Sequence, residues 1–331
     1  VISVLGDRVG LFKGLSEIGG GTSQQLADSL GLNERWVREW LQHQACVNQI
    51  EYEEETQRFS ISPEAAAVLV DEDSPAYLMG AYHSALSVFP AAEKLEDAFR
   101  SGIGMTYDEH GSSCACGMEK MGAYTKKHRL VQEILPLVPG LVERLSKGIK
   151  VADVGCGGAL STVVMAQAFP SSTFVGYDTS EHALDLARKN IEEMGVQNVT
   201  VANPSAQPLP SDSTLDFVTT FDVVHDTPYP DQMIQDIYGA LATGGQWLCE
   251  DIKGLNSFEE NLREHPMAAM LYGFSITICM SSGLSTADGA GLGTLGFTEA
   301  LAEKMMTNAG FAEFANLEVD TPLNNYYLAT K

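Results

Sequence analysis

The chain has 331 residues, of which 44 are acidic and 20 basic, so its formal net charge is −24 at pH 7. This length accommodates two domains or one large one, and an apolar fraction of 44% is that of a folded protein. The charge disfavours a broad surface for nucleic acid or anionic membranes, because phosphates require a positive partner.

The cysteines and the apolar segments indicate whether the chain spans a membrane, binds a metal or forms disulfides. The longest apolar stretch, residues 267–280, is shorter than the roughly 18 residues that a membrane-spanning helix requires. No signal peptide is visible. Of the six cysteines only Cys114 and Cys116 lie close together, without the second pair or the histidines of a zinc site. We therefore predict no metal site, and reduced cysteines in a cytoplasmic protein.

The N-terminal part of the chain has the pattern of a winged helix. Thr22 or Ser23 can cap a first helix that ends at Gly31, and Asn33 can cap a second helix. Two short strands follow, in the stretches QIEYE and RFSIS, with an acidic turn between them. We predict a mainly α winged-helix domain over residues 1–75.

The charges of this domain decide between DNA binding and a structural role. The second helix carries two arginines but also two glutamates, and four more glutamates lie in the wing. Such a surface repels phosphates. We therefore predict no nucleic-acid partner and expect the domain to form a homodimer.

Residues 76–148 are predicted to be a mostly helical linker, interrupted at residues 102–122 by a stretch rich in glycine and methionine. That stretch is either an irregular connection or a lid over a pocket, and both interpretations stay open. With a lid, Tyr107, His110 and Tyr124 are candidate substrate-binding residues.

A strand, a glycine turn and a helix open the C-terminal part of the chain. The strand KVADVG runs into the glycines of GCGG, and a second strand, TFVGYD, ends at Asp178. Glycines after a strand let the backbone approach a ligand, and an acid that ends the second strand can bind ribose hydroxyls. A dinucleotide site requires a third glycine where this chain has Leu160, whereas Asp153 suits a ligand with an ammonium group. The unit therefore favours a nucleoside with an amino-acid tail, S-adenosylmethionine.

The remaining sequence predicts the strands LDFVTT and GGQWLCED, a helix that Gly310 ends, and a final hairpin from FANLEV and NNYYLATK. Between the fifth strand and that helix, residues 252–295 exceed what a minimal fold needs. They include Met270 and Phe274, which can line an apolar substrate cavity. Ordinary helix packing or a subunit interface explains these residues equally well.

Residues 149–331 resemble class I S-adenosylmethionine-dependent methyltransferases. The whole chain resembles their winged-helix subgroup found in mycobacterial and nematode proteins, which is related to plant-type small-molecule O-methyltransferases. The resemblance lies in the stretches GDRVGLF, ERWVREWL, VADVGCGGALST and FDVVHD. It implies an α/β fold in which a Rossmann-like seven-stranded methyltransferase domain follows the winged helix. One departure is Ala159, where the family often has another glycine.

The resemblance also implies which residues hold the cofactor. The amino-acid-tail and loop positions correspond to Asp153, Gly155 and Gly157, and Asp178 is the acid for the ribose. The other positions expected beside the cofactor are Thr179, Ser205, Ala206, Phe221 and Asp222.

The pair His225 and Asp226 is the candidate for catalysis. A neutral histidine can take a proton from an acceptor hydroxyl, and a nearby carboxylate can set its tautomer. In plant-type O-methyltransferases a matching His-Asp pair has this role, which makes His225 the base and Asp226 a candidate for orienting it. Those enzymes continue with a tryptophan that this chain lacks, so a positioning or structural role for His225 stays open.

These features predict a methyltransferase that acts on a small molecule, with a hydroxyl as the first choice of acceptor. An amine or a thiol acceptor is the alternative within the same reaction class. A ligand-sensing winged-helix protein without turnover is the alternative of another class.

Overall fold

The computed structural model describes residues 1–331, and the chain divides into two compact units. The first unit comprises residues 1–86 and 116–128, and the second comprises residues 87–115 and 129–331. The region expected to be a linker and lid is therefore shared between the two units. None of the helices is long and apolar enough to cross a bilayer.

The first unit contains the predicted winged helix. Its helices are α1 (Ile2–Arg8), α2 (Leu11–Glu17), α3 (Ser23–Leu30), α4 (Glu34–Cys46) and α5 (Pro63–Leu69), and its wing is the hairpin of β1 (Glu51–Glu53) and β2 (Arg58–Ser60). The Thr22 side chain accepts the Gln25 N–H in a capping box, and Gly31 ends α3 in the left-handed conformation. Asn33 caps α4. These caps confirm the boundaries that the sequence predicts.

The arginines of α4 are neutralised within their own helix. Arg35 pairs with Glu39, and Arg38 pairs with Glu34. The surface that a DNA-binding winged helix would present thus carries paired charges, in line with the predicted absence of a nucleic-acid partner.

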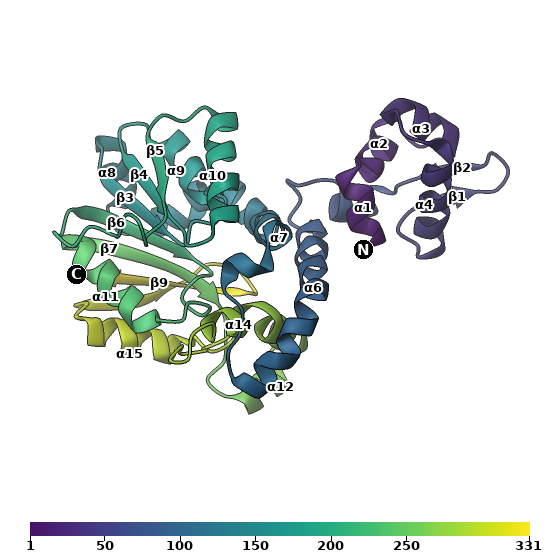
Figure 1. Ribbon diagram of the computed structural model, residues 1–331. Helices are drawn as coiled ribbons and strands as arrows, with labels where there is room; N and C mark the ends of the chain where they lie inside the picture. The colour runs from purple at the N-terminus through teal and green to yellow at the C-terminus, as the bar shows by residue number, and fades with distance from the viewer. The chain divides into compact units, whose positions relative to one another are not determined.

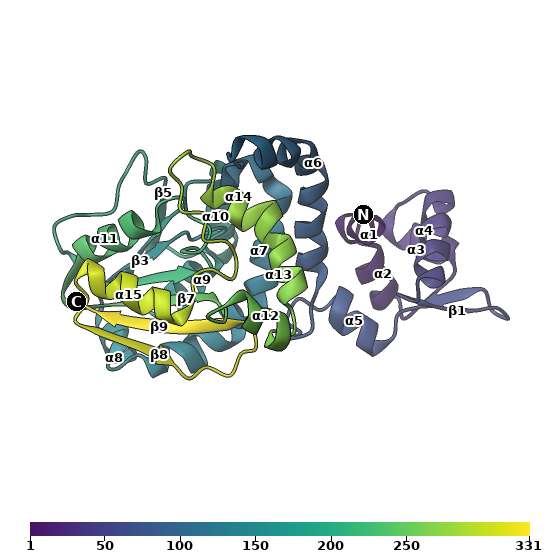
Figure 2. The same cartoon turned by 90° about the horizontal axis from the view of Figure 1, so that it is seen from below.

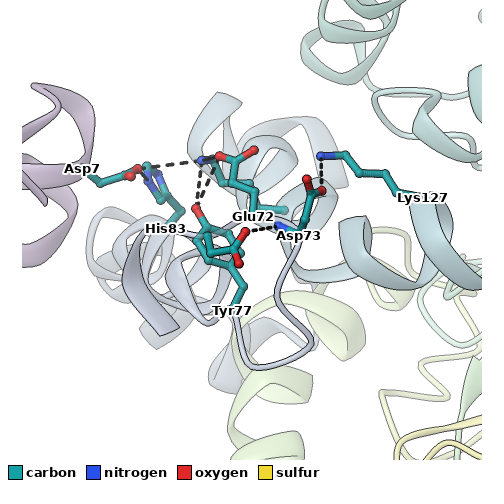
Figure 3. Close-up of polar contacts among 8 residues, drawn as sticks. Asp7, Glu72, Asp73, Tyr77, His83 and Lys127 are labelled. Atoms are coloured by element: carbon teal, nitrogen blue, oxygen red, sulfur yellow. Dashed lines mark hydrogen bonds and ion pairs between the residues drawn. The ribbon is translucent and has the colours of Figure 1, made fainter. Parts of the chain in front are cut away.

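A polar cluster joins α1 and the stretch after α5 to α6 (Met79–Ser101) and α7 (Ser112–Tyr124) within the first unit (Figure 3). The Lys120 ammonium donates to Glu72 Oε1 at 2.7 Å and to the Tyr77 hydroxyl at 3.2 Å, and lies 3.9 Å from Asp7 Oδ2. Asp7 in turn contacts His83 Nε2 at 2.7 Å. Burial lowers the pKa of Lys120, but its hydrogen bond to Glu72 and the charges of Tyr77, Asp7 and Glu72 together outweigh burial and raise that pKa above the ordinary value.

Replacing Lys120 by methionine is expected to destabilise the first unit by about 1–3 kcal/mol, because two carboxylates lose their common donor. Chemical denaturation followed by circular dichroism measures this loss. Lys13→Met is the matched control, since Lys13 and Glu17 form an exposed pair on one helix that contributes about 0.5 kcal/mol or less. Equal effects of the two substitutions would contradict a stabilising role for the cluster.

The second unit is built on the predicted seven-stranded sheet, with strand order β5-β4-β3-β6-β7-β9-β8 (Figure 1). Strands β3 to β7 are parallel, and β9 runs antiparallel to both of its neighbours, β7 and β8. The strands are β3 (Lys150–Val154), β4 (Thr173–Tyr177), β5 (Val199–Ala202), β6 (Leu215–Phe221), β7 (Leu241–Ile252), β8 (Glu313–Leu317) and β9 (Asn324–Thr330). The chain therefore has the α/β, Rossmann-like fold that the sequence predicts.

Helices cover both faces of this sheet, with α8, α9 and α10 on one side and α11 and α15 on the other (Figure 1). They are α8 (Leu141–Lys147), α9 (Leu160–Ala168), α10 (Glu181–Met194), α11 (Pro230–Ala240) and α15 (Glu299–Ala309). On the α11–α15 side Trp247 and Phe297 are fully buried, and on the other side Phe174 and Phe217 fill the core. A strand hydrophobic on both faces is expected at the centre of a covered parallel sheet.

The strand order changes direction between β3 and β6, and such a switch point is where open parallel sheets bind ligands. Beyond the carboxyl ends of the strands lie the turns and helices of the extra segments (Figure 2). They are the 3-10 turn η1 (Tyr107–His110), α12 (Phe258–Glu264), α13 (Ala268–Phe274), the π-helical turn η4 (Ser275–Cys279) and α14 (Met280–Gly283). Between α7 and α8 lie the π-helical η2 (Thr125–Ile134) and the 3-10 turn η3 (Leu135–Leu137).

Candidate active site

Two glycines shape the loop after β3, each for a different reason. Both are left-handed, with φ of +72° at Gly155 and +56° at Gly157. A Cβ on Gly155 would come within 2.4 Å of the Val223 side chain, whereas a Cβ on Gly157 would meet only open space. Gly155 is thus required by packing, and Gly157 leaves room for a ligand to approach the backbone. Ala159 is also left-handed, with φ of +58°, which explains the preference for glycine at this position.

Asp153 is held by three hydroxyl groups inside the protein. Its Oδ2 accepts from Ser161 at 2.7 Å and Thr162 at 2.6 Å, and its Oδ1 accepts from Thr219 at 2.9 Å. The side chain is completely buried. The carboxylate thus fixes the start of α9 to β3 and β6, and its contact with the ammonium group of the cofactor stays a prediction.

Asp178 lies at the end of β4, beside the glycine loop, as predicted. Its Oδ2 accepts the Gly157 N–H at 2.8 Å and its Oδ1 accepts the Ser180 N–H at 2.9 Å. Ser180, rather than Asp178, caps α10. Because Asp178 remains partly accessible and each carboxylate oxygen can accept a second bond, the residue fits a ribose diol. Thr179 follows it on the surface.

The other residues expected beside the cofactor lie at neighbouring strand ends. Ser205 and Ala206 follow β5 and are exposed, in a turn that the Asn203 side chain closes by accepting the Ser205 N–H. Phe221 ends β6 and is buried, and Asp222 adopts φ of +57° and accepts from Asn324 at 2.7 Å. The loop, Asp178 and these strand ends together make a cradle that suits S-adenosylmethionine.

His225 and Asp251 form a buried pair, in which His225 follows β6 and Asp251 lies near the carboxyl end of β7. The ring donates from Nδ1 to Asp251 Oδ1 over 2.6 Å, and the two side chains are 3% and 0% exposed. The partner of the ring is therefore Asp251 rather than Asp226, which follows His225 in sequence but does not bond it. Asp251 comes within reach because β7 runs parallel to β6, with Glu250 opposite Phe221.

Asp226 and Cys279 complete the immediate surroundings of His225. One ligand-type atom from each of the three residues lies within 4.8 Å of the others. Cys279 ends the π-helical turn η4, and its thiol lies close to the His225 side chain. Burial lowers the pKa of His225, but Asp251, followed by Cys279, outweighs burial and raises that pKa well above 6.5. No pattern in the amino-acid sequence singles out Cys279.

The raised pKa predicts how turnover depends on pH. A base must be neutral, so activity is expected to rise with pH through the pKa of His225, above 6.5. Asp251→Asn removes the charge that holds this pKa up, so the rise is expected at lower pH. Asp251→Glu keeps the charge and should keep the rise near its original position. A pH profile of kcat that is identical in the wild type and Asp251→Asn would contradict the coupling.

The segment before α7 closes over the strand ends inside the second unit. Asp108 accepts from the Ser180 hydroxyl at 2.7 Å, and the Met105 N–H donates to Ser281 Oγ at 3.0 Å. Burial, and then the nearby Cys114, Asp226, Cys279 and Asp178, raise the pKa of Tyr107 well above 10. Tyr107 is therefore close to Asp178 and to Asp226 and Cys279, and its role as a lid residue stays a prediction.

The remaining substrate candidates differ in position. His110 is buried, with Nε2 at 3.4 Å from Ser282 Oγ. Phe274 is half-buried, but Met270 is 42% exposed, and Tyr124 belongs to the first unit. The substrate roles of His110, Phe274, Met270 and Tyr124 therefore stay predictions.

Known proteins resemble the chain in both units. Residues 145–310 match the family model of the methyltransferase domain, and residues 1–71 match that of the Rv2258c-like winged HTH domain. Demethylmenaquinone methyltransferase of Listeria welshimeri is 34% identical over 110 residues, which are 33% of this chain and 47% of that protein. The chain thus matches about half the length of this curated relative.

Solved structures share the fold along the whole chain. A putative O-methyltransferase from Nostoc punctiforme has a TM-score of 0.71 at 21% identity, covering 100% of this chain and 94% of that one. Human N-acetylserotonin methyltransferase, solved with S-adenosylmethionine, has a TM-score of 0.69 at 14% identity, covering 100% and 93%.

The matched domain and the cradle at the strand ends lead to the same conclusion. S-adenosylmethionine is the methyl donor that this domain uses. The chain belongs to the methyltransferase domain family, with a winged helix-turn-helix domain preceding its catalytic domain.

Proposed function

We propose that this methyltransferase transfers the methyl group to a hydroxyl of a small molecule, and that His225 removes the hydroxyl proton. The observation that carries the proposal is the buried bond of 2.6 Å between His225 Nδ1 and Asp251 Oδ1. Above its pKa, a histidine held through Nδ1 by a carboxylate is neutral and has a fixed tautomer, in which Nε2 is unprotonated and able to accept a proton.

Each residue of the site has a distinct task. Gly157 and Asp178 would hold S-adenosylmethionine, which supplies a methyl group already activated on a sulfonium sulfur. His225 Nε2 takes the proton from the acceptor hydroxyl as the oxygen attacks, and Asp251 stabilises the imidazolium that results. The proton then passes to water once the methylated product leaves. The protein otherwise has to align the acceptor and exclude water.

Two measurements test this function. Calorimetry with S-adenosylmethionine checks the cofactor, and absence of binding would refute the proposal at its first step. Transfer of a labelled methyl group to metabolite extracts then distinguishes an enzyme from a ligand sensor. Alkali-stable label on an oxygen atom is the expected product, and label on nitrogen, sulfur or carbon would assign a different acceptor.

We propose in addition that the protein is a cytoplasmic homodimer that pairs through the first unit. Val1, Ile2, Leu5 and Val9, in and beside α1, are exposed apolar residues, which supports a covered surface there. Six free cysteines support a reducing compartment. Sedimentation at equilibrium measures the assembly directly, and a monomer at micromolar concentration would contradict the first point.

A further inference from the structure

Four aspartates surround the reaction centre, and three of them have partners. Asp178 accepts two backbone N–H groups, Asp222 accepts from Asn324, and Asp251 holds His225. The fourth, Asp226, has its backbone N–H bonded to Val223, but no hydrogen bond engages its carboxyl group. Asp226 is partly accessible, so a ligand can reach it.

The surroundings of Asp226 are negative. Burial raises the pKa of its carboxyl group to about 7, the nearby His225 opposes that rise, and Asp251, Asp178 and Asp222 add to it. The charged groups that act most strongly on Asp226 are His225, Asp251, Asp178 and Asp222, and the one cation among these four, His225, is already bound by Asp251. These carboxylates would repel a carboxylate or phosphate on the acceptor.

We propose that Asp226 selects acceptors that carry a protonated amine close to the hydroxyl that is methylated. This inference rests on the proposed function and adds the chemical class of its substrate. The ammonium group supplies the donor and the positive charge that the protein does not. Since a ring nitrogen of His225 and a carboxylate oxygen of Asp226 lie within 4.8 Å, one small molecule can reach both.

A divalent metal is the other cation that these residues could receive, since His225, Asp226 and Cys279 are ligand types for zinc. The ammonium is favoured because a metal would occupy the ring nitrogen that serves as the base.

The test uses the full chain with S-adenosylhomocysteine bound and two matched sets of phenols. The first set is 2-(aminomethyl)phenol, 2-ethylphenol and 2-hydroxybenzoate, and the second is tyramine, 4-ethylphenol and 4-hydroxyphenylacetate. Calorimetry is expected to show the amine of at least one set binding about tenfold more tightly than its neutral analogue, as a charge-assisted hydrogen bond allows. The acid of that set is expected to bind most weakly.

Two variants connect this preference to one residue. Asp226→Asn is expected to reduce the ratio of amine to neutral affinity to about one, while Asp231→Asn, which removes an exposed charge on α11, leaves it unchanged. Equal or tighter binding of the acids, or no binding by either amine at millimolar concentration, would overturn the inference. Stoichiometric Zn²⁺ binding that is lost in both Asp226→Asn and Cys279→Ser would overturn it as well. Cofactor binding by the wild type, measured separately, shows whether the proposed function itself has failed.

Discussion

Replacing His225 by asparagine is expected to lower kcat by about 100- to 10,000-fold, the range that a general base contributes. Asparagine keeps a polar group near Asp251 but cannot accept the proton of the acceptor. The affinity for S-adenosylmethionine should stay within about twofold, because the cradle is formed by the glycine loop and Asp178. Single-turnover kinetics with labelled cofactor, together with calorimetry, measures the two quantities separately.

His182→Asn is the matched control, since that histidine is exposed on α10 and its side chain takes no part in the site. Unchanged turnover in His225→Asn would exclude the base. It would then favour an acceptor that needs no proton removed in the rate-limiting step, such as a thiolate. Loss of cofactor binding in the same variant would mean that His225 supports the cradle rather than the chemistry.

The parts of the site that sequence alone predicted are those whose positions follow from short, neighbouring segments of the chain. The loop at Gly155 and Gly157 follows a buried strand directly, and Asp178 ends the next strand along the chain. In a parallel sheet such ends meet at one edge, so adjacency in sequence becomes adjacency in space. The same reasoning placed Phe221 and Asp222 correctly at the end of β6.

The parts that sequence missed depend on contacts between distant segments. The partner of His225 is Asp251, 26 positions away, because β6 and β7 lie side by side in register. The available signal was the acid that ends the strand GGQWLCED. It was not used, because the adjacent Asp226 was already a candidate partner for His225. Cys279 has no such signal, since a π-helical turn in an irregular segment determines where its side chain lies.

Asp153 has a structural role that its motif position did not indicate. Its side chain accepts hydrogen bonds from Ser161, Thr162 and Thr219 inside the domain. Such donors satisfy a buried carboxylate. An acid at this position therefore holds α9 and the strands in place beside the cofactor loop, and these long-range contacts could not be predicted from the motif.

Replacing each of the two loop glycines by alanine is expected to lower the stability of the second unit by different amounts. Gly155→Ala should destabilise the second unit by about 2–5 kcal/mol, combining the cost of a left-handed alanine with overpacking. Its methyl group would lie 2.4 Å from Val223, which is too close for any relaxed contact. Gly157→Ala should cost about 1–2 kcal/mol, the cost of a left-handed alanine alone, since its methyl group enters open space.

The affinity of the folded protein for S-adenosylmethionine should change in the reverse order, with the larger loss in Gly157→Ala. Gly157→Ala is expected to weaken S-adenosylmethionine binding at least about tenfold in a stably folded protein, because the methyl group occupies the space through which a ligand approaches the backbone. Gly155→Ala should lose binding only in proportion to the protein that has unfolded. Thermal denaturation and calorimetry on both variants separate the two effects. Normal cofactor affinity in Gly157→Ala would mean that the ligand does not occupy the open space beside this loop. Of Gly157 and Asp178, only Asp178 would then remain assigned to cofactor binding.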